Sequence, residues 1–239
     1  MVSHSETSII KSLGRFCIGY DPKETDVSTY LEDIRGAVSA KREVRISTLG
    51  GRNCVSVCNL DGVGRVVVKK YMRGGLFQYL VKEKYIRSGK TRAEVEFDLL
   101  RLAKSVGVNV PGPVAFVYKG GFLYEAWLIT REIQGKKSVA ELSIEREDDL
   151  SSVMEELIRQ VGILIRNGIF HVDLHPGNVL VDTSGAVYLL DFDKAYGFVG
   201  RNNLLRDKYL CRWRRAVIKH NLPEVLSEMM SHGLRQSYE

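Results

Sequence analysis

The feature that most constrains the fold is a polar loop set between short apolar stretches. The segment His171-Val-Asp173-Leu-His-Pro-Gly-Asn178 contains proline and glycine, which predict a loop. A Thr-Ser-Gly turn follows, and the strand-like segment 186–192 (AVYLLDF) then brings in Asp191, eighteen residues after Asp173. Strand ends hold side chains in place while leaving them accessible, so we expect Asp173, Asn178 and Asp191 to form one site.

These three residue types suit phosphoryl transfer. One carboxylate can accept the proton of an attacking hydroxyl, while a second carboxylate and an amide oxygen are hard ligands that Mg²⁺ prefers. The metal bridges phosphate oxygens and offsets the charge that develops during transfer. We therefore predict that Asp173, Asn178 and Asp191 together provide a base and magnesium ligands for phosphoryl transfer.

Positive charge is concentrated in two parts of the chain. The net charge is +6, and segment 69–92 holds eight Lys or Arg against one acid, whereas segment 201–219 holds seven against one. Such clusters attract phosphates, nucleic acid or an anionic membrane, or they form an ordinary solvated surface. No aromatic stacking motif of the RNA-binding kind accompanies them, so no nucleic-acid partner is expected.

The first part of the chain reads as β-structure. Segments 43–48, 53–60 and 65–71 are rich in β-branched residues and are separated by the turn sequences LGGR and DGVG, which predicts three antiparallel strands. Two further short strands are expected around 114–118 and 126–132.

One helix, Thr91–Val106, is expected within this β-rich part. Thr91 and Glu94 have the spacing of a capping box, and Gly107 ends the helix. The apolar residues that recur at helical intervals, and that we expect on its buried face, are Val95, Leu99, Leu102 and Val106.

The remainder of the chain reads as mostly helical. Helices are predicted over 149–167, with Gly168 as C-terminal cap, over 204–219 and over 223–230. No apolar run is long enough for a transmembrane helix, and no secretory signal is expected at the N-terminus.

We expect one α+β domain of two lobes with a cleft between them. The N-terminal β-rich lobe would span residues 1–134, of which 1–42 form an extension, and the C-terminal catalytic lobe would span 135–239.

The polar loop resembles the signature of protein-kinase-like enzymes: His-x-Asp, Asn five residues later, and Asp-Phe after a strand. The resemblance implies a two-lobed protein-kinase-like fold with an antiparallel-sheet N-lobe and a compact helical C-lobe. It also implies that Asp173 is the catalytic base, that Asn178 and Asp191 hold magnesium, and that ATP is the phosphoryl donor. Asp193 stands where glycine is expected, and no Ala-Pro-Glu segment occurs in the 46 residues after it. These departures favour a non-protein substrate.

By the same resemblance, a lysine at the end of strand 65–71 grips the ATP phosphates and pairs with a glutamate of the next helix. Lys69 is preferred over Lys70 because it matches the Val-Ala-Ile-Lys motif, and Glu96 is preferred over Glu94 as its partner. Alternation along a strand leaves the choice of lysine open.

Two weaker nucleotide contacts are also implied. Gly50 and Gly51 either cover the ATP phosphates or simply make a tight hairpin. Glu132 and Ile133, in the segment that joins the lobes, would meet adenine through main-chain groups as far as Gln134.

Residues 43–219 as a whole resemble the bacterial 3-deoxy-D-manno-octulosonic acid (Kdo) kinases, within the lipopolysaccharide core kinase family. The resemblance rests on Arg73-Gly-Gly-Leu76 and on Asp191-Phe-Asp193. It implies an ATP-dependent kinase that phosphorylates a sugar hydroxyl of an anionic lipid A–core precursor, in the cytoplasm and peripheral to the anionic inner membrane. Arg73 would contact the anionic sugar, or would be a surface cation beside a flexible turn.

Two alternatives stay open at this point. One is a small atypical protein kinase of the RIO or Bud32 type, and the other is a nucleotide-binding pseudokinase. The intact set of Asp173, Asn178 and Asp191 argues against the pseudokinase.

Overall fold

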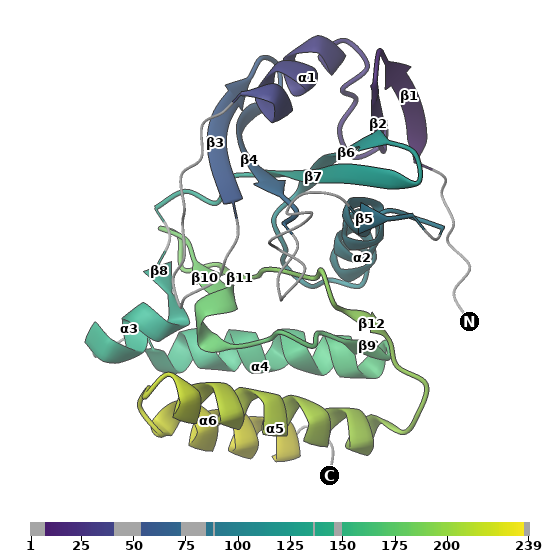
Figure 1. Cartoon of the computed structure of the whole chain (residues 1–239). Helices are drawn as coiled ribbons and strands as arrows, with labels where there is room; N and C mark the ends of the chain where they lie inside the picture. The colour runs from purple at the N-terminus through teal and green to yellow at the C-terminus, as the bar shows by residue number, and fades with distance from the viewer. Residues whose placement is uncertain are drawn as a thin grey trace. The chain divides into compact units, whose positions relative to one another are not determined.

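The computed structural model describes residues 8–40, 54–72, 85–87, 89–135, 137–145 and 150–236. The chain divides into two compact units (Figure 1). The first comprises the chain to Asp98 together with Gly112–Glu132, and the second comprises Leu99–Pro111 and the chain from Ile133 onward. One unit is built on an antiparallel sheet and the other mainly on helices, which confirms the predicted α+β class.

The first unit is built on a seven-stranded sheet with the order β1-β2-β6-β7-β4-β3, and β5 pairs with β7. All of these pairings are antiparallel. The strands are β1 (Ile9–Leu13), β2 (Phe16–Tyr20), β3 (Cys54–Leu60), β4 (Gly64–Lys70), β5 (Tyr85–Ile86), β6 (Pro113–Gly120) and β7 (Leu123–Arg131).

The β3–β4 hairpin forms where the sequence predicts it. Leu60 pairs with Gly64, and the chain reverses through Gly62 and Gly64 with φ angles of +70° and +91°. Glycine adopts such angles without the steric cost that a side chain would add. The predicted strand at 43–48 lies outside the described residues.

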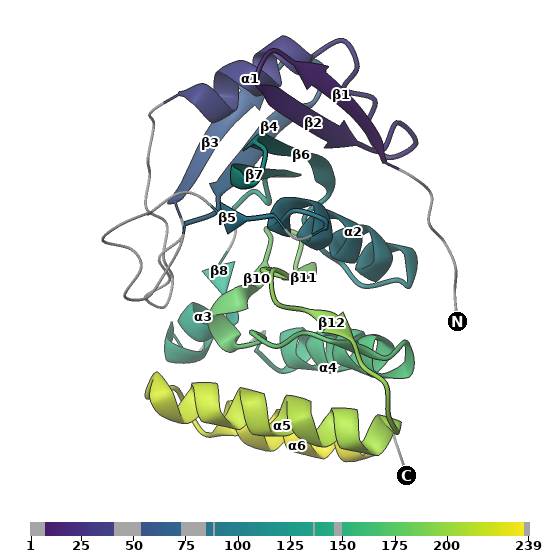
Figure 2. The same ribbon diagram turned by 45° about the vertical axis from the view of Figure 1, so that its right-hand side comes forward.

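Helices cover both faces of this sheet (Figures 1 and 2). On one face α1 (Leu31–Ser39) buries Ile34 and Val38 in a cluster with strand residues such as Val66. On the other face the ring of Phe97, from the first half of α2 (Arg92–Ser105), meets Phe116 edge-on at 5.3 Å. The sequence did not predict β1, β2 or α1, which add two strands and a helix to the expected β-structure.

α2 begins with the predicted capping box. The N–H of Glu94 donates to Thr91 Oγ1 at 3.2 Å, and the N–H of Thr91 donates to Glu94 Oε2 at 3.4 Å. The predicted buried face of this helix is wrong, because Val95 and Leu102 are exposed. The buried face instead carries Ala93, Glu96, Phe97, Leu100 and Ala103. Because several of these residues are small or charged, the spacing of large apolar side chains does not reveal this face.

The second unit contains the helices α3 (Val139–Glu145), α4 (Leu150–Arg166), α5 (Asn202–Lys219) and α6 (Val225–Gln236). α5 and α6 pack along α4 (Figures 1 and 2). The predicted helices match α4, α5 and α6 to within a few residues, apart from the longer C-terminal end of α6, and Gly168 ends α4 with φ +62° as expected. Among the described helices, none combines the length and apolar character needed to cross a bilayer.

Two small sheets lie in the same unit. β8 (Lys137–Ser138), β10 (Val179–Val181) and β11 (Val187–Leu189) form one, and β9 (Ile169–Phe170) pairs with β12 (Tyr196–Gly197) in the other. The fully buried side chain of Gln160, in α4, connects the first of these sheets to the segment around Asn109. Its Nε2 donates to Val187 O at 2.9 Å, and its Oε1 accepts from the N–H of Asn109 at 3.0 Å.

Candidate active site

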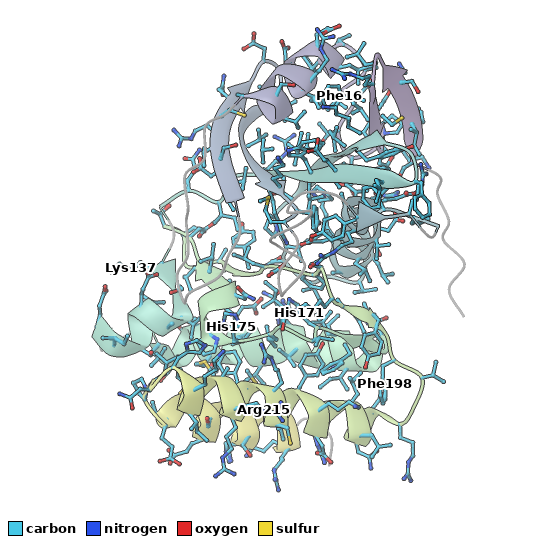
Figure 3. The ribbon with its side chains drawn as sticks, viewed as in Figure 1. Phe16, Lys137, His171, His175, Phe198 and Arg215 are labelled. Atoms are coloured by element: carbon cyan, nitrogen blue, oxygen red, sulfur yellow. The ribbon has the colours of Figure 1, made fainter. Side chains whose placement is uncertain are left out.

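The polar loop connects β9 to β10 and contains a single 3₁₀ turn, Pro176–Asn178. Figure 3 labels His171 and His175 on this loop. β10 and β11 pair antiparallel with Val179 opposite Leu189, and the N–H of Leu190 donates to Asn178 O at 2.9 Å. This register places Asn178 and Asp191 at the same end of the β10–β11 hairpin, so the short hairpin brings the two residues together.

The side chain of Asn178 is held by the loop itself. Its Nδ2 donates to the main-chain oxygen of Asp173 at 3.0 Å. An amide has one oxygen and one nitrogen, so this bond leaves the Oδ1 atom of Asn178 as the one suited to a cation. Asp173 and Asn178 are thereby fixed relative to each other, as the sequence spacing predicts.

Asp191 has an unusual backbone conformation. Its φ angle is +62°, in the left-handed region that few residues other than glycine adopt. Aspartate tolerates this region better than most residues, and backbone of this kind is concentrated at functional sites. The conformation turns the chain sharply just after β11, at the residue that the sequence predicts to be a metal ligand.

His171 fastens the loop to its surroundings. Its ring is fully buried, and Nε2–H donates to Leu190 O at 2.7 Å. Burial lowers the pKa of His171, so the ring is neutral, and a carbonyl acceptor requires the proton to be on Nε2. The hydroxyl of Tyr209 accepts from the N–H of His171 and donates to Ile169 O, both at 2.8 Å. Tyr209 therefore connects α5 to the loop, and no motif in the sequence points to this role.

The carboxylate of Asp173 is held by two cations. Lys194 Nζ donates to Oδ2 at 2.8 Å, and an Nη of Arg212 donates to Oδ1 at 3.2 Å. The sequence singled out neither residue for this role. Arg212 belongs to the cationic segment 201–219, which we interpreted as a phosphate, membrane or solvated surface. For Arg212 the surface interpretation is wrong, because α5 turns it toward the loop.

Arg212 is also incompletely satisfied. Its Nε–H is buried and meets no acceptor within the part of the chain that the structure describes. Burial lowers the pKa of the neighbouring His175 to about 4, and the positive charge of Arg212 contributes to this shift. The His175 Nδ1 atom accepts from the N–H of Gly177 at 3.1 Å and thereby caps the 3₁₀ turn.

The first unit contains the ion pair that the sequence favours. Lys69 Nζ lies 3.1 and 3.0 Å from the two carboxylate oxygens of Glu96, which is almost fully buried. The hydroxyl of Tyr71 also donates to this carboxylate. The neighbouring Lys70 lies instead over the ring of Trp127, 5.6 Å from its centroid. The structure thus pairs Lys69, and not Lys70, with Glu96.

The structure describes only some of the weaker nucleotide contacts predicted from the sequence. Gly50, Gly51 and Arg73 lie outside the described residues. The N–H of Glu132 donates to the main-chain oxygen of Arg65 at 3.1 Å, and its carboxylate pairs with the Arg65 side chain. The N–H of Glu132 is thus already engaged, which restricts the expected main-chain contacts with adenine to other groups in this segment.

Comparison with known protein families identifies the class of the protein. Residues 38–225 match the model of the lipopolysaccharide kinase (Kdo/WaaP) family. The chain belongs to this family. The match spans the described residues of the polar loop, the Lys69–Glu96 pair and α5, and it makes the protein a phosphotransferase that acts on an alcohol group.

Individual relatives agree with the family assignment. The chain is 34% identical to the 3-deoxy-D-manno-octulosonic acid kinase of Vibrio cholerae serotype O1 over 72% of this chain and 70% of that protein. It is 35% identical to the protein of the same name from Vibrio vulnificus strain CMCP6, over 72% and 74% of the two chains. A third such relative, from Photobacterium damsela subsp. piscicida, is 35% identical over 64% of this chain and 65% of its own. These matches favour a sugar kinase over an atypical protein kinase.

The residues at the hairpin end fit magnesium. Among the described residues, no group of three or more His, Cys, Asp or Glu side chains is arranged to hold a metal ion. Mg²⁺ needs no such protein cage, because it is usually bound by one or two protein oxygens, phosphates and water. A carboxylate from Asp191 and the Asn178 Oδ1 atom provide such oxygens.

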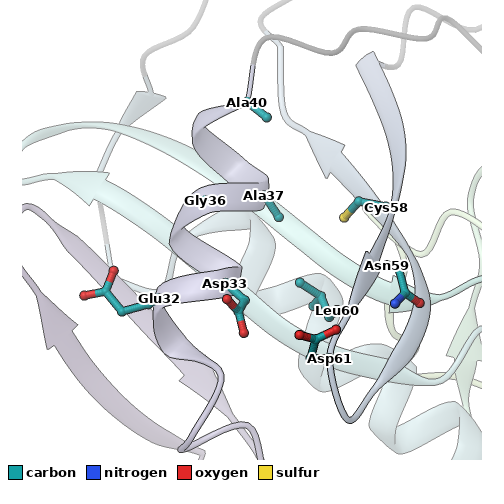
Figure 4. A pocket seen from close by; sticks show the side chains of 9 residues that line it. All are labelled: Glu32, Asp33, Gly36, Ala37, Ala40, Cys58, Asn59, Leu60 and Asp61. Atoms are coloured by element: carbon teal, nitrogen blue, oxygen red, sulfur yellow. The ribbon is translucent and has the colours of Figure 1, made fainter.

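A hollow of about 360 Å³ lies in the first unit between α1 and the β3–β4 hairpin (Figure 4). Three carboxylates line it, those of Glu32, Asp33 and Asp61. Acidic walls repel a triphosphate, so this hollow does not suit the nucleotide.

Proposed function

We propose that this protein transfers the γ-phosphoryl group of ATP to a hydroxyl of a Kdo residue on a lipid A–core precursor. The observation that carries the proposal is the polar loop. Asp173, Asn178 and Asp191 are joined by the Asn178–Asp173 bond and by the β10–β11 register, within a chain of the lipopolysaccharide kinase family. The relatives named as Kdo kinases support Kdo as the acceptor.

In this proposal Asp173 is the general base. The acceptor hydroxyl would lie within hydrogen-bond reach of its carboxylate and pass its proton there as the oxygen attacks phosphorus. Lys194 and Arg212 hold the carboxylate in a fixed orientation. His171 and Tyr209 hold the loop that carries Asp173.

Asn178 and Asp191 are the proposed magnesium ligands. When bound, Mg²⁺ would offset the negative charge on the phosphate oxygens. The protein prepares the site by directing the Nδ2 atom of Asn178 to the Asp173 carbonyl and by the left-handed turn at Asp191.

Lys69 is the proposed contact to the ATP phosphates, with Glu96 and Tyr71 holding its ammonium group in place. Main-chain groups around Ile133 would meet adenine. Gly50 and Gly51 would cover the phosphates, and Arg73 would contact the anionic sugar. We further propose that residues 1–134 and 135–239 act as the two lobes of one kinase domain.

We also propose contact with the anionic cytoplasmic face of the inner membrane, because the acceptor is a lipid. The exposed side of α5 carries cationic and apolar residues, and exposed cations attract an anionic membrane surface. Figure 3 labels Arg215 on this helix. The exposed residues of this surface stripe are Leu204, Lys208, Cys211, Arg215 and Ile218.

The membrane proposal is tested with vesicles that contain an anionic lipid. Replacing Arg214 and Arg215 with serine should lower vesicle binding and reduce its salt dependence. Arg212 is left unchanged because it contacts Asp173. Binding that is unchanged in the double variant would return these residues to an ordinary solvated surface.

The proposed reaction is tested by measuring ATP turnover with two acceptors. A Kdo-bearing lipid A precursor should be phosphorylated, whereas an acidic peptide should not. Transfer to the peptide alone would favour the protein-kinase alternative.

A further inference from the structure

Two cations from different parts of the second unit converge on the proposed base. Lys194 lies three residues after Asp191, and Arg212 lies in the middle of α5. Each engages a different oxygen of Asp173, at 2.8 Å for Lys194 and 3.2 Å for Arg212. A single ion pair would suffice to orient one carboxylate, so the second cation calls for another explanation.

The group formed by Asp173 and its two partners carries a net positive charge, because two cationic side chains face one carboxylate. This excess charge lies where the acceptor hydroxyl must sit, within hydrogen-bond reach of Asp173. An acceptor that carries its own negative charge would neutralise it.

Both cations have donors to spare for a second anion. A guanidinium offers five N–H donors and an ammonium three, and each gives one bond to Asp173 here. Arg212 retains 28% and Lys194 61% of their side-chain exposure, so a ligand can reach both. The planar fork of a guanidinium matches a carboxylate in particular.

We propose that Arg212 and Lys194 bind the carboxylate of an acidic acceptor sugar and thereby select it over neutral sugars. The inference rests on the proposed function, since the acceptor named there is an octulosonic acid. As the acceptor carboxylate takes up the two cations, their hold on Asp173 loosens, and the base becomes available for the acceptor hydroxyl. Arg212 and Lys194 are in this view specificity-determining residues as well as partners of the base.

The competing explanation is that both cations only orient Asp173. The two explanations differ in what happens when the acceptor loses its charge. We therefore compare the Kdo-bearing lipid A precursor with its carboxylate methyl ester, and wild-type protein with Arg212→Gln and Lys194→Gln. Arg235→Gln is the matched control, because Arg235 is an exposed arginine of α6 in the same unit.

In the wild type, the ester should be used about 10- to 100-fold less efficiently than the acid, as expected for loss of a hydrogen-bonded charge. Arg212→Gln should reduce use of both acceptors, because Arg212 also orients Asp173, but it should reduce use of the acid far more, mainly through the acceptor KM, so the preference falls toward one. Lys194→Gln should act in the same direction and more weakly, and because Lys194 is exposed the variant should keep the fold. Arg235→Gln should keep the full preference, and nucleotide affinity should be unchanged in all variants.

Two results would overturn the inference. Wild-type protein that uses acid and ester equally has no carboxylate site. An equal loss on both acceptors in Arg212→Gln and Lys194→Gln would mean that the cations only orient the base.

Binding of free Kdo and its methyl ester, measured by calorimetry with a non-hydrolysable ATP analogue present, separates this inference from the proposed function. Preferential binding of the acid that is lost in Arg212→Gln, without phosphoryl transfer to either lipid acceptor, would support the carboxylate site and refute the kinase assignment. Phosphoryl transfer to the lipid acceptors without any preference for the acid, in binding or in turnover, would support the kinase assignment and refute the carboxylate site.

Discussion

Replacing Glu96 with glutamine should lower the stability of the first unit and raise the KM for ATP. Glu96 is only 2% exposed, and its carboxylate accepts bonds from Lys69 and from the Tyr71 hydroxyl. Glutamine keeps the shape of the side chain but carries no charge, and its NH₂ group is a poor neighbour for an ammonium. The substitution therefore removes the counter-charge that Glu96 provides to Lys69.

The size of the effect follows from the geometry. At 3.0 Å, two unit charges attract by about 5.5 kcal/mol at an effective dielectric constant of 20. Desolvation offsets part of this attraction, and removing one partner of a buried pair costs about 3–5 kcal/mol. Lys69 is 15% exposed, so water offsets some of its lost contact, and we expect a loss of about 2–3 kcal/mol in the free energy of unfolding.

Urea unfolding followed by tryptophan fluorescence measures this loss, because Trp127 lies in the first unit and Trp213 in the second. The matched control is Glu94→Gln on the same helix. Glutamine serves as well as glutamate in a capping box, so Glu94→Gln should change stability by less than about 0.5 kcal/mol. A wild-type urea midpoint together with an unchanged KM for ATP in Glu96→Gln would refute the role given to the pair.

Three further predictions follow from the same geometry. Lys69→Met should lower kcat/KM for ATP by about 100-fold, whereas Lys70→Met should do little because Lys70 stacks on Trp127; a reversed order in steady-state kinetics would contradict the assignment. Asp191→Asn, which tolerates the φ of +62° better than alanine, should abolish transfer across a magnesium titration while circular dichroism stays native. For His175 the folded pKa of about 4 lies below the usual 6.5, so its contribution to stability is full above pH 6.5 and is lost as pH falls toward 4. His175→Asn keeps a capping acceptor but does not titrate in this range. It should therefore reduce the slope of the unfolding free energy against pH between these limits, by less than about 1.4 kcal/mol per pH unit.

Local sequence signals predicted those parts of the fold that depend on near neighbours. The β3–β4 hairpin follows from its Asp-Gly-Val-Gly turn, and α2 begins at the capping box of Thr91. The β1 strand (Ile9–Leu13) escaped notice because most of it is exposed, so its sequence lacks the alternation that a half-buried strand shows. The buried face of α2 was missed because it includes alanines and a glutamate.

The candidate site was partly predictable for the same reason. Asp173 and Asn178 are close in sequence, and a short hairpin joins them to Asp191. Arg212 pairs with a carboxylate 39 residues away, and a run of positive charge does not reveal which of its members turns inward. Packing of α5 through buried residues such as Trp213 decides that orientation.

The assignment of Asp173 as base is tested most directly by initial-rate kinetics on a Kdo-bearing lipid A precursor, with nucleotide affinity measured in parallel. Asp173→Asn should keep ATP binding and lose about 10²- to 10⁴-fold in turnover, because an amide cannot take the hydroxyl proton. Asp193→Asn, beyond the proposed metal ligand, should retain far more activity. Near-normal turnover in Asp173→Asn together with an inactive Asp193→Asn would contradict the account at its centre.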